Sequence, residues 1–165
     1  MPEIFPWLLF LHVLAAIVAF GPTFAFSIIG GMGGKEPQHA NFATRVSHRV
    51  GDVLVTPFAL SMLITGALMI WAAGLPLFQR DARWLLLAIL LYLLALALSF
   101  GVSQPNVRRI IALSGGDGAS AGPPQGPPPP ELLRSIAVVQ RTGMVLGLLV
   151  VVIVFLMVVK PDLGF

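Results

Sequence analysis

Residues 8–29, LLFLHVLAAIVAFGPTFAFSII, decide the class of this protein because they contain no Asp, Glu, Lys or Arg over 22 consecutive positions. A helix of this length rises about 30 Å, which matches the hydrocarbon thickness of a bilayer. A cleaved signal peptide would need a basic segment ahead of an apolar run of about 7–15 residues. Glu3 is the only charged side chain that precedes this run. We therefore expect a retained transmembrane helix.

The composition of the whole chain is that of a membrane protein. The 165 residues are 57% hydrophobic and 10% charged, with a mean hydropathy of +0.92, whereas soluble domains are about 25% charged. The ten Lys and Arg residues are scattered among apolar runs, so they indicate topology signals and lipid contacts rather than a nucleic-acid surface. The absence of cysteine excludes disulfides, thiolate catalysis and cysteine-ligated metals.

Three further apolar runs follow the first, each bounded by charged residues. They predict an all-α fold, an up-and-down transmembrane bundle of four helices in a single domain, residues 1–165. The predicted spans are residues 5–29, 50–75, 84–104 and 141–160. Because only a short loop joins the second and third spans, we expect them to be antiparallel neighbours.

The distribution of Lys and Arg predicts the orientation. Both termini and the 79–83 loop share one side of the membrane, which carries Arg80, Arg83 and Lys160. The segments 30–49 and 103–142 share the other side, which carries seven basic residues: Lys35, Arg45, Arg49, Arg108, Arg109, Arg134 and Arg141. The positive-inside rule places this second side in the cytoplasm and both termini outside.

The two cytoplasmic segments combine helical and helix-breaking stretches. We expect GGMGGKEP, residues 30–37, to end the first helix through its glycines and Pro37. Helical extensions are predicted over 38–50, 104–113 and 131–141. Between the last two, residues 114–130 contain eleven Gly or Pro among seventeen. This composition predicts a flexible cytoplasmic loop, with a docking site for a proline-binding module as the alternative.

His12 is the one ionisable side chain inside the first apolar run. It lies about two turns inside the outer boundary and shares a helical face with Ala15, Ala19 and Thr23. This small, weakly polar face predicts that His12 points toward the other helices and not toward lipid. Counting turns along the other predicted spans places four side chains at a similar depth: Thr65, Met69, Tyr92 and Met157.

Three interpretations of this layer are open. His12 can be a neutral packing residue hydrogen-bonded to Tyr92 or Thr65, which removes the cost of an unpaired polar group in hydrocarbon. It can ligate haem or copper with a methionine, since imidazole and thioether are suitable ligands. It can also relay protons. We favour packing, because a single histidine makes a weak site. The candidate residues for the cofactor, with haem b as the group considered, are His12, Tyr92, Met69 and Met157.

A second polar cluster lies at the cytoplasmic ends of spans two and four. Its members are Arg45, His48, Arg49, Asp52 and Arg141. His48 and Asp52 are four residues apart and share a helical face. We expect Asp52 to pair with Arg49 or Arg141 instead of remaining an isolated charge. The cluster is interpreted as a charge belt that anchors the helices, with an anion or lipid-headgroup pocket as the sharper alternative.

Further along span two, Pro57, Ser61 and Thr65 form a stripe at four-residue spacing. The hydroxyls can satisfy backbone groups near the proline, so the stripe predicts kinked packing. The facing spans carry too few polar residues for a continuous aqueous channel. We find no metal motif, no paired carboxylates within the spans, no phosphate loop and no nucleophile elbow. These features favour a non-catalytic protein.

Three segments carry a family resemblance: FLHVLAAIVAFGPTFAF in span one, VGDVLVTPFALSMLITGALMI in span two and WLLLAILLYLLALAL in span three. They resemble a bacterial integral membrane family of four helices, a domain of unknown function. The LHVLAA opening is also similar to the first helices of the copper-resistance protein D group and of the related membrane protoporphyrinogen oxidase. That second resemblance implies a haem- or substrate-ligating role for His12. Span three contains no Lys or Arg, and no second histidine lies inside a span.

We therefore expect a multi-pass protein of the bacterial inner membrane. Its predicted role is that of a non-catalytic accessory or structural component. The expected partners are membrane lipids and either other integral membrane proteins or a second copy of the chain. The alternatives are a haem- or copper-handling redox protein that uses His12 and, more weakly, a small transporter.

Overall fold

The computed structural model describes residues 3–74, 82–115 and 128–162. These residues form helices and turns, with no β-strand among them. The predicted loop 114–130 lies largely outside the described residues, which resume at residue 128. The all-α fold expected from the sequence is confirmed.

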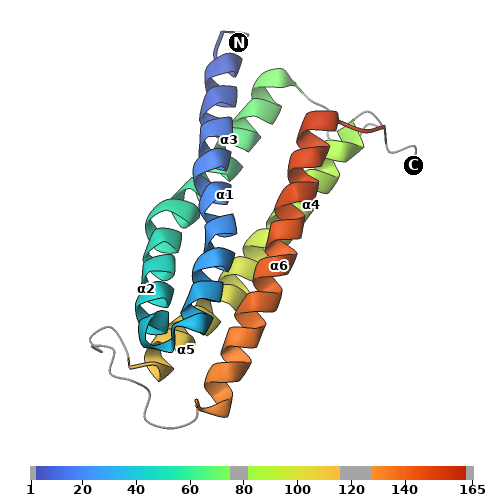
Figure 1. The fold of residues 1–165 in the computed structure, drawn as a ribbon. Coiled ribbons are helices and arrows are strands. Elements are labelled where there is room, and N and C mark those ends of the chain that lie inside the picture. The colour runs from blue at the N-terminus through green and yellow to red at the C-terminus, as the bar shows by residue number, and fades with distance from the viewer. Residues whose placement is uncertain (1–2, 75–81, 116–127, 163–165) are drawn as a thin grey trace.

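Four long helical segments form the bundle (Figure 1). The first is α1 (Phe5–Lys35) and the last is α6 (Pro130–Val159). The second runs from α2 (Ala40–Val50) into α3 (Thr56–Ala73), and the third runs from α4 (Arg83–Leu98) into α5 (Gln104–Leu113). Each is long and apolar enough to cross a membrane. The helical extensions predicted beyond the spans are present as α2, α5 and the first turns of α6.

Both chain ends lie at the same end of the bundle (Figure 1), which we call the terminal end. The opposite end, the basic end, contains α2, α5 and the start of α6. Six of the seven basic residues predicted for this side lie there: Lys35, Arg45, Arg49, Arg108, Arg109 and Arg134. The seventh, Arg141, lies about three turns into α6. This separation of charge is the pattern on which the orientation was predicted, and the orientation itself stays a prediction.

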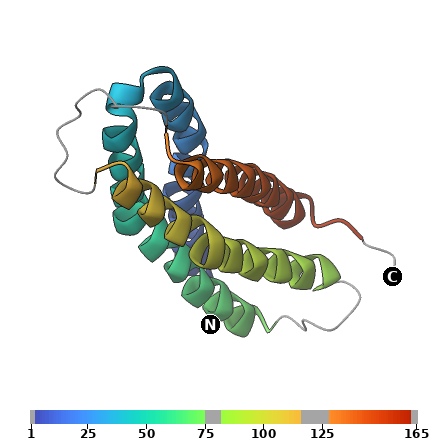
Figure 2. The ribbon, with the colours of Figure 1, turned by 90° about the horizontal axis from the view of Figure 1, so that it is seen from below.

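The helices pack as two pairs, α1 with α3 and α4 with α6. The pairs meet mainly toward the basic end, where α2 contacts α5 and α1 contacts α6. They diverge toward the terminal end (Figures 1 and 2). The second and third segments run antiparallel, as expected, but each packs most closely against another helix. The short connection between them therefore did not determine the main packing partners.

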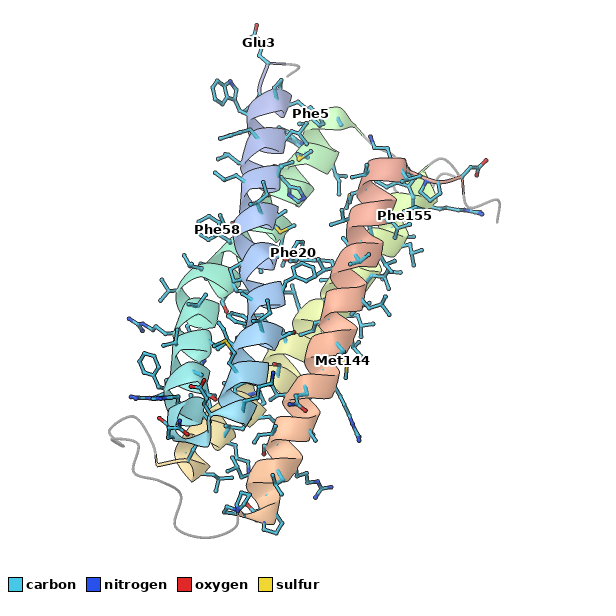
Figure 3. All side chains as sticks on the ribbon, in the orientation of Figure 1. Glu3, Phe5, Phe20, Phe58, Met144 and Phe155 are labelled. Carbon is cyan, nitrogen blue, oxygen red and sulfur yellow. The ribbon has the colours of Figure 1, made fainter. Side chains whose placement is uncertain are left out.

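The bundle interior is narrow and built from small side chains. Ala15 and Ala19 of α1 and Ala59 of α3 are buried and let the backbones approach closely. Larger buried members of the same core are Met62, Tyr92 and Ile153. Apolar side chains also project outward around the whole bundle (Figure 3), and Leu148 and Val158 are 65% and 75% exposed. Such an outer surface suits contact with lipid rather than water.

Two π-helical turns interrupt the second and third segments just before prolines. η2 (Gly51–Val55) joins α2 to α3, and η4 (Ser99–Ser103) joins α4 to α5. The prolines that follow are Pro57 and Pro105, the second residues of α3 and α5. A proline has no N–H to donate and crowds the carbonyl four residues back, which a widened turn accommodates. The bend between α2 and α3 is visible in Figure 1, so the kink predicted at Pro57 is built as a π turn.

The end of the first helix differs from its prediction. The glycines of residues 30–34 lie inside α1, which continues to Lys35. Glu36 then leaves the helical conformation, with φ −123° and ψ 76°, because a residue before a proline disfavours it. Gly33 has a packing reason: a Cβ there would lie 3.4 Å from the Cα of Ala40. The glycine allows the end of α1 to lie against the start of α2.

Candidate functional sites

His12 contacts α3 in the terminal half of the bundle. Its Nδ1 lies 2.9 Å from Oγ1 of Thr65. The next residue of α3, Gly66, makes room for the ring, because a Cβ there would lie 3.4 Å from Cε1 of His12. Of the two partners expected for a packing histidine, the structure selects Thr65.

The hydrogen bonds of Thr65 predict which nitrogen of the His12 imidazole carries the hydrogen. The Thr65 hydroxyl donates its single hydrogen to the Ser61 carbonyl at 2.9 Å, with the Met62 carbonyl farther away at 3.4 Å. With the hydroxyl donating to that carbonyl, we predict that Oγ1 of Thr65 accepts from Nδ1–H of His12. In this predicted tautomer, a neutral His12 keeps its lone pair on Nε2, the nitrogen that can ligate a metal or accept a proton.

Tyr92, the other partner considered for His12, bonds to a different group. The Tyr92 hydroxyl donates a 2.6 Å hydrogen bond to the carbonyl of Ala59, and its ring meets Phe20 edge to face with centroids 6.4 Å apart. Ala59 precedes Thr65 by six residues, about 9 Å along a helix. Figure 3 shows Phe20 directed into the space between the two helix pairs. Tyr92 therefore lies nearer the basic end than the His12 layer, and the equal depth expected from counting turns is wrong.

The methionines considered as ligands have different surroundings. Met157 packs against the buried core, and Met69 lies one turn from Gly66 on α3. Sequence reasoning missed Met62, which is only 7% exposed and lies within a turn of Thr65. The signal in the sequence was that Met62 and Thr65 are three residues apart, so they share a helix face. In the described part of the chain, no group of three or more His, Asp or Glu residues could hold a metal ion.

The second cluster surrounds a hollow of about 350 Å³ at the basic end. Its walls are Arg45, His48, Arg49 and Asp52 from the second segment and Ile111 from α5. Nδ1 of His48 lies 3.6 Å from Oδ1 of Asp52. The structure thus corrects the expectation that Asp52 pairs with Arg49 or Arg141. The i, i+4 relation on one helix face brings His48 closer, while Arg141 is on α6 and does not line the hollow.

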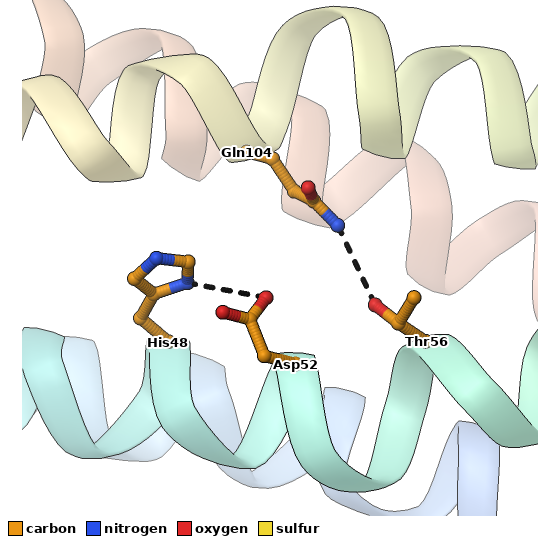
Figure 4. Close-up of polar contacts among 4 residues, drawn as sticks. All are labelled: His48, Asp52, Thr56 and Gln104. Atoms are coloured by element: carbon orange, nitrogen blue, oxygen red, sulfur yellow. Dashed lines mark hydrogen bonds and ion pairs between the residues drawn. The ribbon is translucent and has the colours of Figure 1, made fainter.

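The polar face continues from the hollow into the bundle (Figure 4). Thr56 follows Asp52 by four residues, and Nε2 of Gln104 donates a long hydrogen bond of 3.5 Å to its hydroxyl. Thr56 and Gln104 each precede a proline that follows a π turn. Sequence reasoning did not select either residue, although the repeated polar–proline pair was a signal. This contact links the two π-turn regions across the bundle.

Residues 6–161 match the model of a protein family described as a predicted integral membrane protein, DUF2269. No curated protein and no solved structure matches the chain. The matched range includes His12 and the hollow at the basic end. It confirms the expectation of a membrane domain without an assigned function. The resemblance to the copper-resistance protein D group stays an expectation.

Proposed function

Since the chain belongs to the DUF2269 family of predicted integral membrane proteins, we propose that it is a non-catalytic accessory component of a bacterial inner membrane. In this role it associates through its helices with other integral membrane proteins or with a second copy of itself. Both termini face outward, and the basic end lies in the cytoplasm.

The observation that carries this proposal is that the polar side chains inside the bundle are hydrogen-bonded to other helices or to the backbone. His12 is bonded to Thr65, Thr65 to the Ser61 carbonyl, and Tyr92 to the Ala59 carbonyl. These contacts join helices or satisfy backbone groups. A polar group that is engaged in this way stabilises packing and is not presented to a substrate. The interior therefore supports a structural role.

The outer side of α6 offers a surface for association. Gly143 and Gly147 stand four residues apart, and a Cβ at either position would meet no atom within 4 Å. They adjoin Met144 and Leu148, whose side chains are 68% and 65% exposed. Small residues at this spacing let a second transmembrane helix approach closely. We place the partner helix along this side of α6.

Native mass spectrometry of the protein extracted in mild detergent tests the proposal. The wild type is expected to carry a second protein chain, and Gly147→Leu to lose it because the added side chain blocks close approach. Ile17→Phe is the matched control, since it adds volume to an apolar position of α1 that is 65% exposed and lies outside this surface, so it should retain the partner. A wild type found only as a single chain contradicts the proposal, as does a Gly147→Leu variant that keeps its partner.

A second candidate is haem or copper handling by His12. The observation that favours it is the 2.9 Å contact between Nδ1 and Oγ1 of Thr65, which orients the ring as a supporting contact does at a metal site and, in the predicted tautomer, leaves Nε2 as a ligand. The donor chemistry fits: the imidazole of His12 would hold the group, with a thioether of Met62, Met69 or Met157 as the second donor. Bound haem would supply one-electron redox chemistry.

Absorption spectroscopy of the purified protein tests this candidate. A Soret band that is present in the wild type, absent in His12→Ala and retained in His48→Ala supports haem ligation by His12. His48 is the suitable control because it lies at the opposite end of the bundle. For copper, metal analysis of the same three proteins replaces the spectrum. A colourless, metal-free wild type rejects the candidate.

A further inference from the structure

The hollow at the basic end has the charge and shape of an anion site. It is lined by two guanidinium groups, Arg45 and Arg49, and one imidazole, against the single carboxylate of Asp52. That carboxylate is engaged with His48 on the same helix face. Among the described residues, no carboxylate lies within ion-pair distance of Arg49. The lining therefore has an excess of positive charge.

The hollow also has an apolar wall. A belt of charged residues that only anchors the helices would not need such a wall. Ile111 of α5 closes it on one side and is 7% exposed. A wall of low dielectric strengthens the attraction between an arginine and an anion. The volume of about 350 Å³ lies at the lower end of the range of ligand pockets, about 300–1,000 Å³. Arg45 and Arg49, four residues apart, belong to one helix face, so both forks can address one ligand.

The surroundings of the hollow suit a ligand at the membrane boundary. Phe42 and Val53 lie one turn before Arg45 and one turn after Arg49, and their side chains are 62% and 50% exposed. Helical periodicity places both residues beside Arg49, on the side away from His48, as an apolar strip. A ligand with a phosphate group and an apolar tail would contact both surfaces, whereas free phosphate would use only the hollow.

We propose that Arg45, His48 and Arg49 form a binding site for a phosphate group, supplied by an anionic lipid headgroup or by free phosphate. Arg49 holds the phosphate oxygens through paired N–H donors, Arg45 adds positive charge to the lining, and Asp52 orients the imidazole of His48. This site is independent of the helix association proposed above, because it lies on α2 and not on α6.

The test uses the full-length protein in nanodiscs. In the first arm, discs contain equal phosphatidylglycerol and phosphatidylcholine, and native mass spectrometry counts the lipids that stay bound. In the second arm, discs contain phosphatidylcholine alone, and calorimetry measures binding of inorganic phosphate. Retention of phosphatidylglycerol identifies a lipid headgroup, and binding in the second arm alone identifies free phosphate. Absence of binding in both arms overturns the proposal.

Three variants distinguish a specific binding site from nonspecific attraction by the positive charge of the basic end. Arg49→Gln is expected to weaken binding about tenfold or more, the equivalent of one charge-assisted hydrogen bond. Arg134→Gln removes the same charge from the same end of the bundle, outside the hollow, and should leave binding unchanged. Arg49→Lys keeps the charge but loses the planar fork, so it should also weaken binding. Equal losses in Arg49→Gln and Arg134→Gln, or full binding by Arg49→Lys, overturn the site.

Discussion

Tyr92 of α4 donates a 2.6 Å hydrogen bond to the backbone carbonyl of Ala59 in α3, and so connects the two helix pairs inside the bundle. The ring also packs edge to face on Phe20 of α1. One side chain thus contacts both helices of the opposite pair. It lies where the pairs come together, on the basic side of the His12 layer.

Removal of the Tyr92 hydroxyl is expected to weaken the junction between the pairs. Tyr92→Phe should lower the free energy of unfolding by about 0.5–1.5 kcal/mol, the net value of one hydrogen bond. Tyr92→Ala should cost about 3–5 kcal/mol, because it also removes the ring from the core. Denaturant titration in detergent measures both values. A Phe variant as stable as the wild type would show that the hydrogen bond contributes nothing to the junction.

The positions of His12 and Tyr92 show what the sequence could and could not predict. Hydropathy located all four spanning helices, and the small face around His12 indicated its direction toward other helices. Pairing across the bundle was a different problem. Turn counting gave Tyr92 the depth of His12, whereas Tyr92 bonds Ala59, six residues nearer the basic end of α3 than Thr65, so Thr65 and not Tyr92 meets His12.

At the basic end, too, the sequence predicted which residues cluster but not which of them pair. The cluster around Asp52 was visible in the sequence, and four of its five predicted members line one hollow. Its pairing was wrong because charge alone favoured an arginine, although the i, i+4 rule already placed His48 on the same face. Arg141 could not be excluded without knowing that α6 packs against α4 and α5 and lies away from α2.

The hydrogen bonds around Thr65 predict the tautomer of His12. We expect Nδ1 to carry the hydrogen and Nε2 to be unprotonated in the neutral ring. Nitrogen-15 NMR of histidine-labelled protein distinguishes the two nitrogens, and His12→Ala assigns the signal. A neutral His12 with its hydrogen on Nε2 would contradict the direction assigned to the Thr65 contact and would weaken the case for metal ligation.

We expect a larger side chain to destabilise the end of α1 at Gly33 but not at Gly34. Gly33→Leu places atoms against Ala40, whose Cα would already lie 3.4 Å from a Cβ at this position. We expect it to separate α1 from α2 and to lower the midpoint of thermal unfolding. Gly34→Leu is the control, because a Cβ there meets no atom within 4 Å. Equal melting temperatures for the two variants would show that the α1–α2 contact does not need the glycine.

Gly66 should be required for the position of the His12 ring. In an open helical site, replacing glycine by leucine improves helix propensity by about 1 kcal/mol or slightly less. At Gly66 this gain is opposed, since the added side chain begins 3.4 Å from Cε1 of His12. We expect Gly66→Leu to destabilise the protein and to break the contact between His12 and Thr65. Ala67→Leu, at the next and more exposed position of α3, should be neutral or stabilising. Denaturant titration gives the stabilities, and the His12 nitrogen signals report the contact. If Gly66→Leu left both unchanged, the ring would not be held against α3.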